Sequence, residues 1–531
     1  MTDLYQTPIA IPIAELLMVD VASKLPAGSS PWWIARLLAA MAARESRLLR
    51  NRAYYRGEQD TWRLHSEAAR EAFGRTFTQL KANLAERIVE EAAQRLKVES
   101  FRVPVAAAPG ADAASVESDT EAWRIWQANG MDSRAAIAHS EAIAMGECPV
   151  IVDRDPADAK TPRITVEDPL QVIVERDPAN PRRRLAALKR WDDPDGTRVL
   201  ILYLPDRVEW WRGVSARSGG YKGNSASSFE LGGIAWTLDA ERSGAPPVAD
   251  TVPVVLLVNK PRVDGTGQGE HESVIPLLDA LNKTLLDLLT TSEFAAFPLR
   301  YLLGVSLDSE PDRPEGTDAE TEDSIGRPAR SDAPIIAAIN RWIRVDDPEA
   351  KIGQLAAADM KPFIEAIQTF VELNGTVTGT PYHLLLNGSR SVPMTGEARK
   401  TAEKPLEYKI DRKAVDFGEA WEEVMRLAFL TAGDTERAST GSEVQWRPAA
   451  AANETQHMDA LVKQKDMGVD FVTLMEQVPY SPEQIARIVA RKAAEDAIPI
   501  PARPMPGGTA ALLPAGEAVV PPSAEAPQPD A

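Results

Sequence analysis

The chain has 531 residues, and its 59 Lys and Arg against 78 Asp and Glu give a formal net charge of −19. This excess of acid argues against binding DNA by phosphate neutralisation, which needs clustered lysines and arginines, but it allows a surface that repels DNA. No stretch approaches the roughly 18 uninterrupted apolar residues of a membrane span, and the N-terminus lacks the pattern of a secretory signal. The single cysteine, Cys148, excludes an intrachain disulfide framework and a multi-cysteine metal site. We therefore expect a soluble protein of about three or four domains.

The first 270 residues divide into a helical part and a strand-rich part. Helical spacing of apolar residues predicts helices over 31–56, 78–96, 119–129 and 133–146, with a small-residue linker at 104–118. From residue 148, short β-branched and aromatic runs are broken by Asp-Pro, Asn-Pro and Asp-Gly pairs, which is typical of an antiparallel sheet. The predicted strands are 150–153, 164–166, 170–175, 185–191, 199–204, 208–212 and 253–259. Residues 213–230 predict a loose hairpin tip or an excursion from the sheet.

Two helices then bracket a non-helical insertion. Ser273 is a suitable cap for a helix that ends near Pro298, and Asp359 for a second helix with Gly375 at its C′ position. Between them, residues 308–323 contain eight acids and one base, so we expect this segment to be solvated. Short strands at 299–305 and 334–345 are predicted to flank it.

The remaining third of the chain is mainly helical. Residues 376–394 show no clear periodicity, and a long helix is predicted over 395–432. A last helical region spans about 452–496, interrupted near Val478-Pro479. Residues 501–531 hold eight prolines and eight alanines, a composition that predicts disorder.

Motifs for chemistry are sparse. No phosphate-binding G-x-x-x-x-G-K-[ST] occurs, and the five histidines lack metal-site spacing. The glycines of 265–269 (GTGQG) are interpreted as a flexible hinge, with a phosphate site at a helix start as the alternative. Cys148 is interpreted as a buried thiol, and the Arg182–Arg184 triplet either as a solvated turn or as a nucleic-acid contact. We predict no catalytic residues, no metal site and no cofactor.

The order of these elements resembles the portal proteins of tailed bacteriophages, in particular the family whose reference member is the SPP1 portal. The resemblance spans roughly residues 30–500. It rests on several segments that follow one another in the family's order: Tyr54–Gly57, Asn83-Leu84 through Gln94–Val98, Trp126–Gly130 leading to Gly146, Asp168-Pro169, Pro253–Val255, and Thr395–Ala398 opening the long helix with Phe417 and Trp421.

The resemblance implies an α+β, mainly helical portal fold. Its parts would be an N-terminal arm (1–30), a β-rich wing with helices (31–270), a first stem helix (271–297), a clip (298–358) and a second stem helix (359–375). They would continue with a tunnel loop (376–394), a long kinked wing helix with a following strand (395–450), a crown (451–500) and a disordered tail (501–531).

The resemblance also implies a function. The chain would form a ring, twelve-fold in this family, at one capsid vertex, as a channel for packaging, retaining and ejecting double-stranded DNA. Its partners would be the terminase large subunit, the head-tail connector, and the major capsid and scaffold proteins. It would reside in the virion, and in the host cytoplasm during assembly. The residues expected to face DNA in the tunnel loop are Tyr382, His383, Asn387, Ser389 and Arg390.

Two departures and two alternatives accompany this interpretation. The acidic segment 308–323 is unusual for a clip, and no basic belt is evident in the stem, which puts docking through basic clip residues in doubt. One alternative is a phosphate- or nucleotide-handling enzyme that uses Gly265–Gly269, which a titratable cluster around that loop would favour. The other is a non-portal minor head protein without a twelve-fold pore.

Overall fold

The structure is a computed structural model. It describes residues 25–61, 64, 67, 80–105, 115–215, 227–296, 300–303, 351–354, 359–386, 395–448, 454–469, 471–476, 478 and 482–496. Contacts divide the chain into two units, Met1–Lys463 and Gln464–Ala531. Helices and antiparallel sheets both occur, so the α+β prediction is confirmed at that level. In the portion described, we find no helix with the length and apolar content needed to span a bilayer.

The helices of the first 150 residues form close to where their caps predict. Helix α2 (Ser30–Tyr55) begins after Ser29, whose hydroxyl accepts the Trp32 N–H. Helix α4 (Leu84–Ala93) begins after Asn83 and is shorter than predicted. Helices α5 (Thr120–Ala128) and α6 (Met131–Met145) follow, and α6 ends at Gly146 with φ of 96°, a conformation that favours glycine.

The predicted antiparallel strands are confirmed, but they form separate sheets rather than one. A three-stranded sheet has the order β11 (Val254–Val258), β3 (Glu147–Asp153), β4 (Arg163–Val166). A six-stranded sheet has the order β5 (Val172–Asp177), β6 (Asn180–Asp192), β7 (Arg198–Tyr203), β8 (Val208–Ser215), β10 (Ile234–Gly244), β9 (Ser228–Leu231). The loose tip predicted at 213–230 is wrong at both ends, which belong to β8 and β9, and residues 216–226 lie outside the described residues.

A third sheet corrects the predicted linker at 104–118. Strand β1 (Val98–Val105) pairs with β2 (Ser115–Ser118) on one side and with β14 (Glu443–Trp446) on the other. The ends of the supposed linker are therefore strands. Their pairing with β14 joins segments more than 300 residues apart, so no local pattern could indicate it.

Two of the apolar clusters pack helices against each other and against the sheets. In one, α2 packs on the six-stranded sheet, with Leu37 and Leu38 near Leu188 and Trp211. The other surrounds His139 of α6, whose Nδ1 lies 3.1 Å from the Leu96 carbonyl and whose Nε2 accepts the Trp421 indole N–H at 2.9 Å. Burial lowers the pKa of His139 to about 4, so the imidazole is neutral at pH 7.

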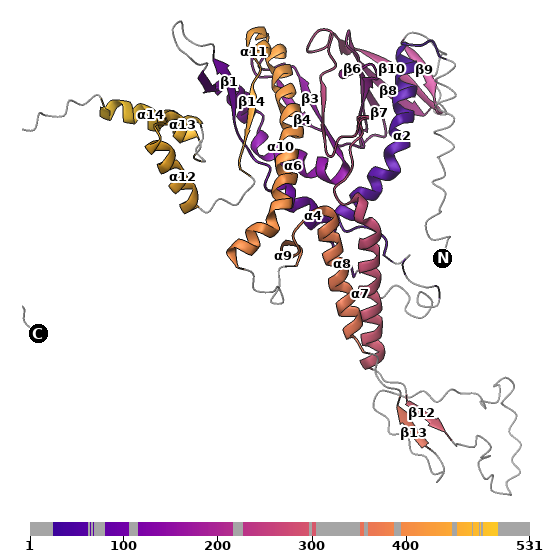
Figure 1. Cartoon of the computed structure of the whole chain (residues 1–531). Coiled ribbons are helices and arrows are strands. Elements are labelled where there is room, and N and C mark those ends of the chain that lie inside the picture. Colours follow the sequence, from indigo (N-terminus) through magenta and orange to yellow (C-terminus); the bar gives the residue numbers. More distant parts are fainter. Residues whose placement is uncertain are drawn as a thin grey trace, which may run out of the picture. The chain divides into compact units, whose positions relative to one another are not determined.

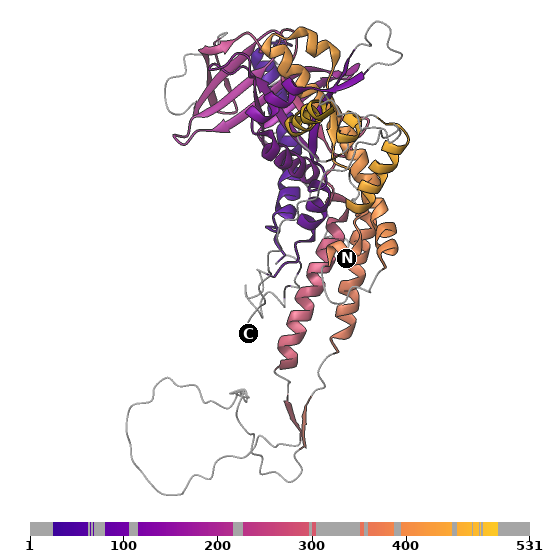
Figure 2. The same ribbon diagram turned by 90° about the vertical axis from the view of Figure 1, so that its left-hand side faces the viewer.

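The two helices that bracket the insertion lie side by side (Figures 1 and 2). A 3-10 turn (Glu272–Val274) leads into α7 (Ile275–Ala296), and α7 packs against α8 (Lys361–Thr378). Their shared cluster joins Leu278 near the start of α7 to Val371 near the end of α8, so the helices run antiparallel. Strand β12 (Arg300–Leu303) pairs with β13 (Lys351–Gln354), while the strand predicted at 334–345 and the acidic segment 308–323 lie outside the described residues.

The predicted end of the second helix is wrong by about one turn. Helix α8 continues through Gly375 and ends at Gly379, whose φ is 64°. Gly375 is needed for another reason: a Cβ there would lie 2.7 Å from the Thr380 carbonyl oxygen, which folds back over the helix end. The segment 376–394 therefore begins inside a helix.

The long helix is confirmed almost to the residue. Helix α10 (Gly396–Ala432) follows a short α9 (Tyr382–Leu385), begins after the capping hydroxyl of Thr395 and ends at Gly433, before α11 (Thr435–Thr440). Beyond it lies α12 (Glu454–Asp466). Within the second unit α13 (Phe471–Glu476) packs against α14 (Pro482–Asp496). Residues 1–24 and the predicted tail 501–531 lie outside the described residues.

Candidate functional site between the α7–α8 pair and α10

The five residues predicted to face DNA divide into two groups. Asn387, Ser389 and Arg390 lie outside the described residues. Tyr382 packs against the apolar cluster shared by α4, α7 and α8. His383 is largely buried, and its Nε2 lies 3.0 Å from Oε1 of Glu403. Both described side chains are therefore engaged within the chain.

Glu403 joins the chain on the two sides of residues 387–394. Besides His383, its carboxylate contacts the Nε of Arg399 at 3.2 Å and lies 3.7 Å from Arg95 of the segment after α4. Burial opposes ionisation of Glu403, but the hydrogen bonds from His383 and Arg399 and the charge of Arg95 outweigh it and lower the pKa. A second tie is the Arg87 guanidinium, which donates to the Leu384 carbonyl at 2.9 Å.

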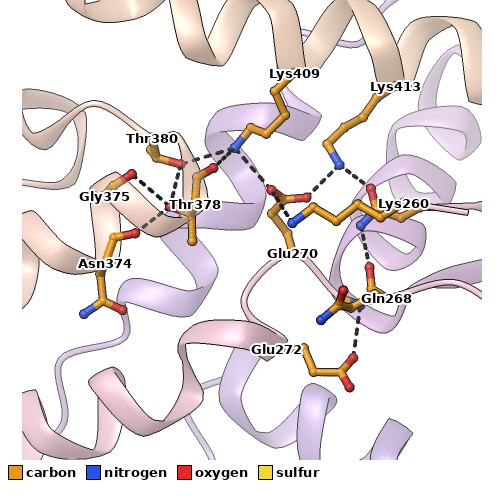
Figure 3. A network of polar contacts seen from close by, with 12 residues as sticks. Lys260, Gln268, Glu270, Glu272, Asn374, Gly375, Thr378, Thr380, Lys409 and Lys413 are labelled. Atoms are coloured by element: carbon orange, nitrogen blue, oxygen red, sulfur yellow. Dashed lines mark hydrogen bonds and ion pairs between the residues drawn. The ribbon is translucent and has the colours of Figure 1, made fainter. Parts of the chain in front are cut away.

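Further along α10, two lysines converge on one buried carboxylate, Glu270 (Figure 3). Its Oε2 lies 2.7 Å from the Lys413 ammonium, and its Oε1 lies 3.1 Å from Lys260 and 3.4 Å from Lys409. Lys413 also donates to the side-chain oxygen of Asn259. We call Glu270, Lys260, Lys409 and Lys413 the Glu270 junction.

Lys409 extends the junction to the end of α8. Its ammonium donates to the Thr378 carbonyl at 2.9 Å and lies 3.3 Å from the Thr380 hydroxyl (Figure 3). A cation at a helix C-terminus satisfies free carbonyls and interacts favourably with the helix dipole. The junction therefore ties three parts together: the loop before α7, the end of α8 and the middle of α10.

The charges of the junction are mutually dependent. Burial would raise the pKa of Glu270, but Lys413, Lys409 and Lys260 together lower it below its usual range, so the carboxylate is ionised. Burial lowers the pKa of Lys409 to about 8, against the opposing effect of Glu270, and also lowers that of Lys413. One anion thus compensates three cations, two of which are almost wholly removed from water.

The glycine-rich loop 265–269 packs against the end of α6 rather than forming a free hinge. A Cβ on Gly267 would lie 1.8 Å from the Gly146 carbonyl oxygen, and one on Gly269 would lie 2.5 Å from that of Ala144. The alternative phosphate site is also disfavoured, because the N–H groups of Gly265, Thr266, Gln268 and Gly269 already have acceptors. The N–H of Gly269 bonds to the Glu272 carboxylate, and those of Gln268 and Glu270 bond to backbone carbonyls.

The arrangement suits anchoring rather than catalysis. A titratable cluster does adjoin the loop, which was the sign expected of an enzyme, and a lysine pKa near 8 is often found in active sites. Here, however, the lysines are enclosed and bonded to protein acceptors. Cys148 is buried with a raised pKa, which disfavours a nucleophilic thiolate. Within the ranges that the structure covers, no cluster of three or more His, Cys, Asp or Glu side chains could hold a metal.

The described part thus contains an antiparallel helix pair, α7 and α8, whose end is bonded to the long helix α10 through the Glu270 junction. The chain belongs to the family described as phage portal protein, SPP1 Gp6-like, whose model matches residues 34–496. Because this range covers most of the chain, the family resemblance inferred from the order of the segments is confirmed.

Two relatives support the assignment. The chain is 28% identical over 428 residues to the portal protein of Mycobacterium phage D29, covering 75% of this chain and 78% of that protein. It is 27% identical over 445 residues to the portal protein of Mycobacterium phage L5, covering 80% of each.

Proposed function

We propose that the chain assembles into a closed ring of about twelve copies at one capsid vertex, forming the channel for DNA packaging, retention and ejection. The observation that carries this proposal is the antiparallel α7–α8 pair, which brackets residues 297–360. The Glu270 junction bonds this pair to α10. Family membership supports the same function. The channel axis would run along the stem pair.

Within that ring, the acidic composition serves passage of DNA. A wall of net negative charge avoids lasting phosphate contacts, each of which would add a release step to translocation. We retain Asn387, Ser389 and Arg390 as the residues proposed to face DNA. Tyr382 and His383, because of their contacts within the chain, are assigned to anchoring the start of that segment.

The proposed partners follow from the same architecture. Residues 298–358, between the stem helices, would dock the terminase large subunit during packaging and the head-tail connector afterwards. The major capsid and scaffold proteins would surround the ring, in the host cytoplasm during assembly and in the virion thereafter.

The DNA-facing role is tested by Arg390→Glu. Around a twelve-fold ring this substitution changes the charge by about −24, which should repel the duplex and reduce DNA packaging or retention without loss of the ring. The matched control is Arg198→Glu, which makes the same charge change at the exposed start of β7. Normal genome filling and retention in the Arg390→Glu particles would remove Arg390 from the mechanism.

A further inference from the structure

A groove of about 930 Å³ is lined by residues of β5, β6, β11 and α10, and it reaches the turn that follows Lys260. One wall carries Arg176 and Arg182, from β5 and β6, and Arg262, from the turn after β11. A second group of lining residues, the acidic wall, consists of Glu419 and Glu422 of α10 and Glu443 at the start of β14; Arg102 of β1, the register partner of Glu443, lines the groove beside them. The two walls thus present opposite charges to the same space.

Some charges in the groove are already neutralised within the chain. Arg184, the last residue of the arginine triplet, donates to Glu423 at 2.7 Å, and Arg426 binds the same carboxylate at 2.6 Å. These contacts bind β6 to α10. They rule out the view that the whole triplet is a solvated turn.

The three arginines of the basic wall, by contrast, have no such ion pairs in the described part of the chain. Among the residues that the structure describes, no carboxylate lies within ion-pair distance of the guanidinium groups of Arg176, Arg182 or Arg262. Arg176 is half-buried, and its pKa is lowered first by burial and then by the charge of Arg184; the charge of Glu147, a carboxylate already paired with Arg44, opposes this only in part. An incoming carboxylate would relieve this unfavourable arrangement of like charges.

Within the described residues, the carboxylates of the acidic wall also lack partners of opposite charge. Burial raises the pKa of Glu422; the hydrogen bond from the Val444 N–H opposes this, and the charges of Glu419 and Glu443 add to it. In the ranges described, neither Glu419 nor Glu443 has a cation within ion-pair distance. A cation brought to this wall would therefore be stabilised by several carboxylates.

The occupant must carry both signs of charge. A polyanion such as DNA would meet three glutamates on one wall, and a simple cation would meet three arginines on the other. Copies of a chain with a net charge of −19 repel one another unless their contacts place unpaired cations opposite acids. Three unpaired arginines in one groove of such an acidic chain fit that need.

We propose that this groove receives a second copy of the chain, the neighbouring subunit of the ring. This inference rests on the proposed function, because it assigns a surface to the contact that closes the ring. In a heterologous ring every subunit offers the groove once and fills its neighbour's groove once. The Val263 side chain, fully exposed on the turn beside Arg262, lies next to this contact.

The first experiment reverses charge on the basic wall. Arg182→Glu combined with Arg262→Glu changes two exposed side chains, so the fold should persist, and the fraction of rings in mass photometry should fall roughly tenfold or more. The control is Arg198→Glu with Arg242→Glu, two exposed arginines with weak 3.9 Å partners outside the groove, which should leave ring formation unchanged. Circular dichroism checks the fold of every variant, and Glu419→Lys tests the opposite wall.

A second experiment identifies the occupant without changing charge. A photo-reactive amino acid replacing Val263 should cross-link to another copy of the chain in assembled rings. If the basic-wall double variant and Glu419→Lys both form rings in the same fraction as the wild type, the groove assignment is overturned. Cross-links from position 263 only to capsid or scaffold protein would also overturn it. If the wild-type chain forms no ring, the proposed function itself fails, which is a different outcome.

Discussion

Replacing Glu270 with glutamine tests the physical account of the junction most sharply. The substitution keeps the shape of the side chain but removes the one anion that faces Lys260, Lys409 and Lys413. The lysine side chains are 39%, 14% and 3% exposed, so Lys260 can rehydrate while Lys413 cannot. Leaving a buried charge uncompensated costs about 3–5 kcal/mol, and we expect a loss of that order.

The matched control removes a cation instead. Lys409→Met leaves Glu270 with Lys413 at 2.7 Å and Lys260 at 3.1 Å, and it removes the longer 3.4 Å ion pair together with the bonds to Thr378 and Thr380. Its cost should be about 1 kcal/mol, because burial of one of three like charges is relieved at the same time.

Hydrogen exchange provides the assay. A single free energy of unfolding is poorly defined for a chain of several parts, but amide exchange reports local opening. Peptides that cover the end of α8 and residues 406–417 should lose protection strongly in Glu270→Gln and only weakly in Lys409→Met. Equal protection in Glu270→Gln and the wild type, or a larger loss in Lys409→Met, would refute the reasoning.

Three further predictions concern the wing and α10. His139 has a folded pKa of about 4 against 6.5 unfolded, so the unfolded state binds more protons between these values; lowering the pH from 7 to 5 should cost about 2 kcal/mol of stability. His139→Gln should reduce this pH dependence in denaturation curves, and an unchanged dependence would show that other groups produce it. Gly267→Ala, whose Cβ would lie 1.8 Å from a carbonyl oxygen, should destabilise the protein by more than about 3 kcal/mol. Gly265→Ala, with φ of 79° and only an ordinary 3.9 Å contact between its Cβ and Arg176, should cost about 1–2 kcal/mol. Similar melting temperatures for the two variants would contradict the packed-loop geometry. Pro405→Ala supplies the backbone N–H that α10 lacks at this position and should slow hydrogen exchange over residues 396–404. An unchanged exchange rate would show that Pro405 does not strain the helix.

The sequence predicted those elements whose signals are local. Helix α10 lies almost where it was predicted; in the structure Thr395 caps its start, and Gly433, in a left-handed conformation, follows its last residue. Glycine can mislead, however. Gly375 and Gly379 are equally plausible helix ends, and only the fold-back of Thr380 shows that Gly375 serves close packing instead.

The Glu270 junction was missed, because Lys409 and Lys413 lie more than 130 positions from Glu270 in the chain. A signal was nevertheless present. Lys413 falls in phase with the buried stripe of α10, between Ile410 and Phe417, where a lysine needs an anionic partner. The identity of that partner depends on tertiary structure, as does the pairing of β14 with β1.

Electron microscopy of the purified chain tests the central claim most directly. The account predicts rings with an open central channel and a mass of about 690 kDa, corresponding to twelve chains of 57.8 kDa. Particles that stay at the mass of one chain across micromolar concentrations, also in the presence of capsid and scaffold proteins, would contradict it.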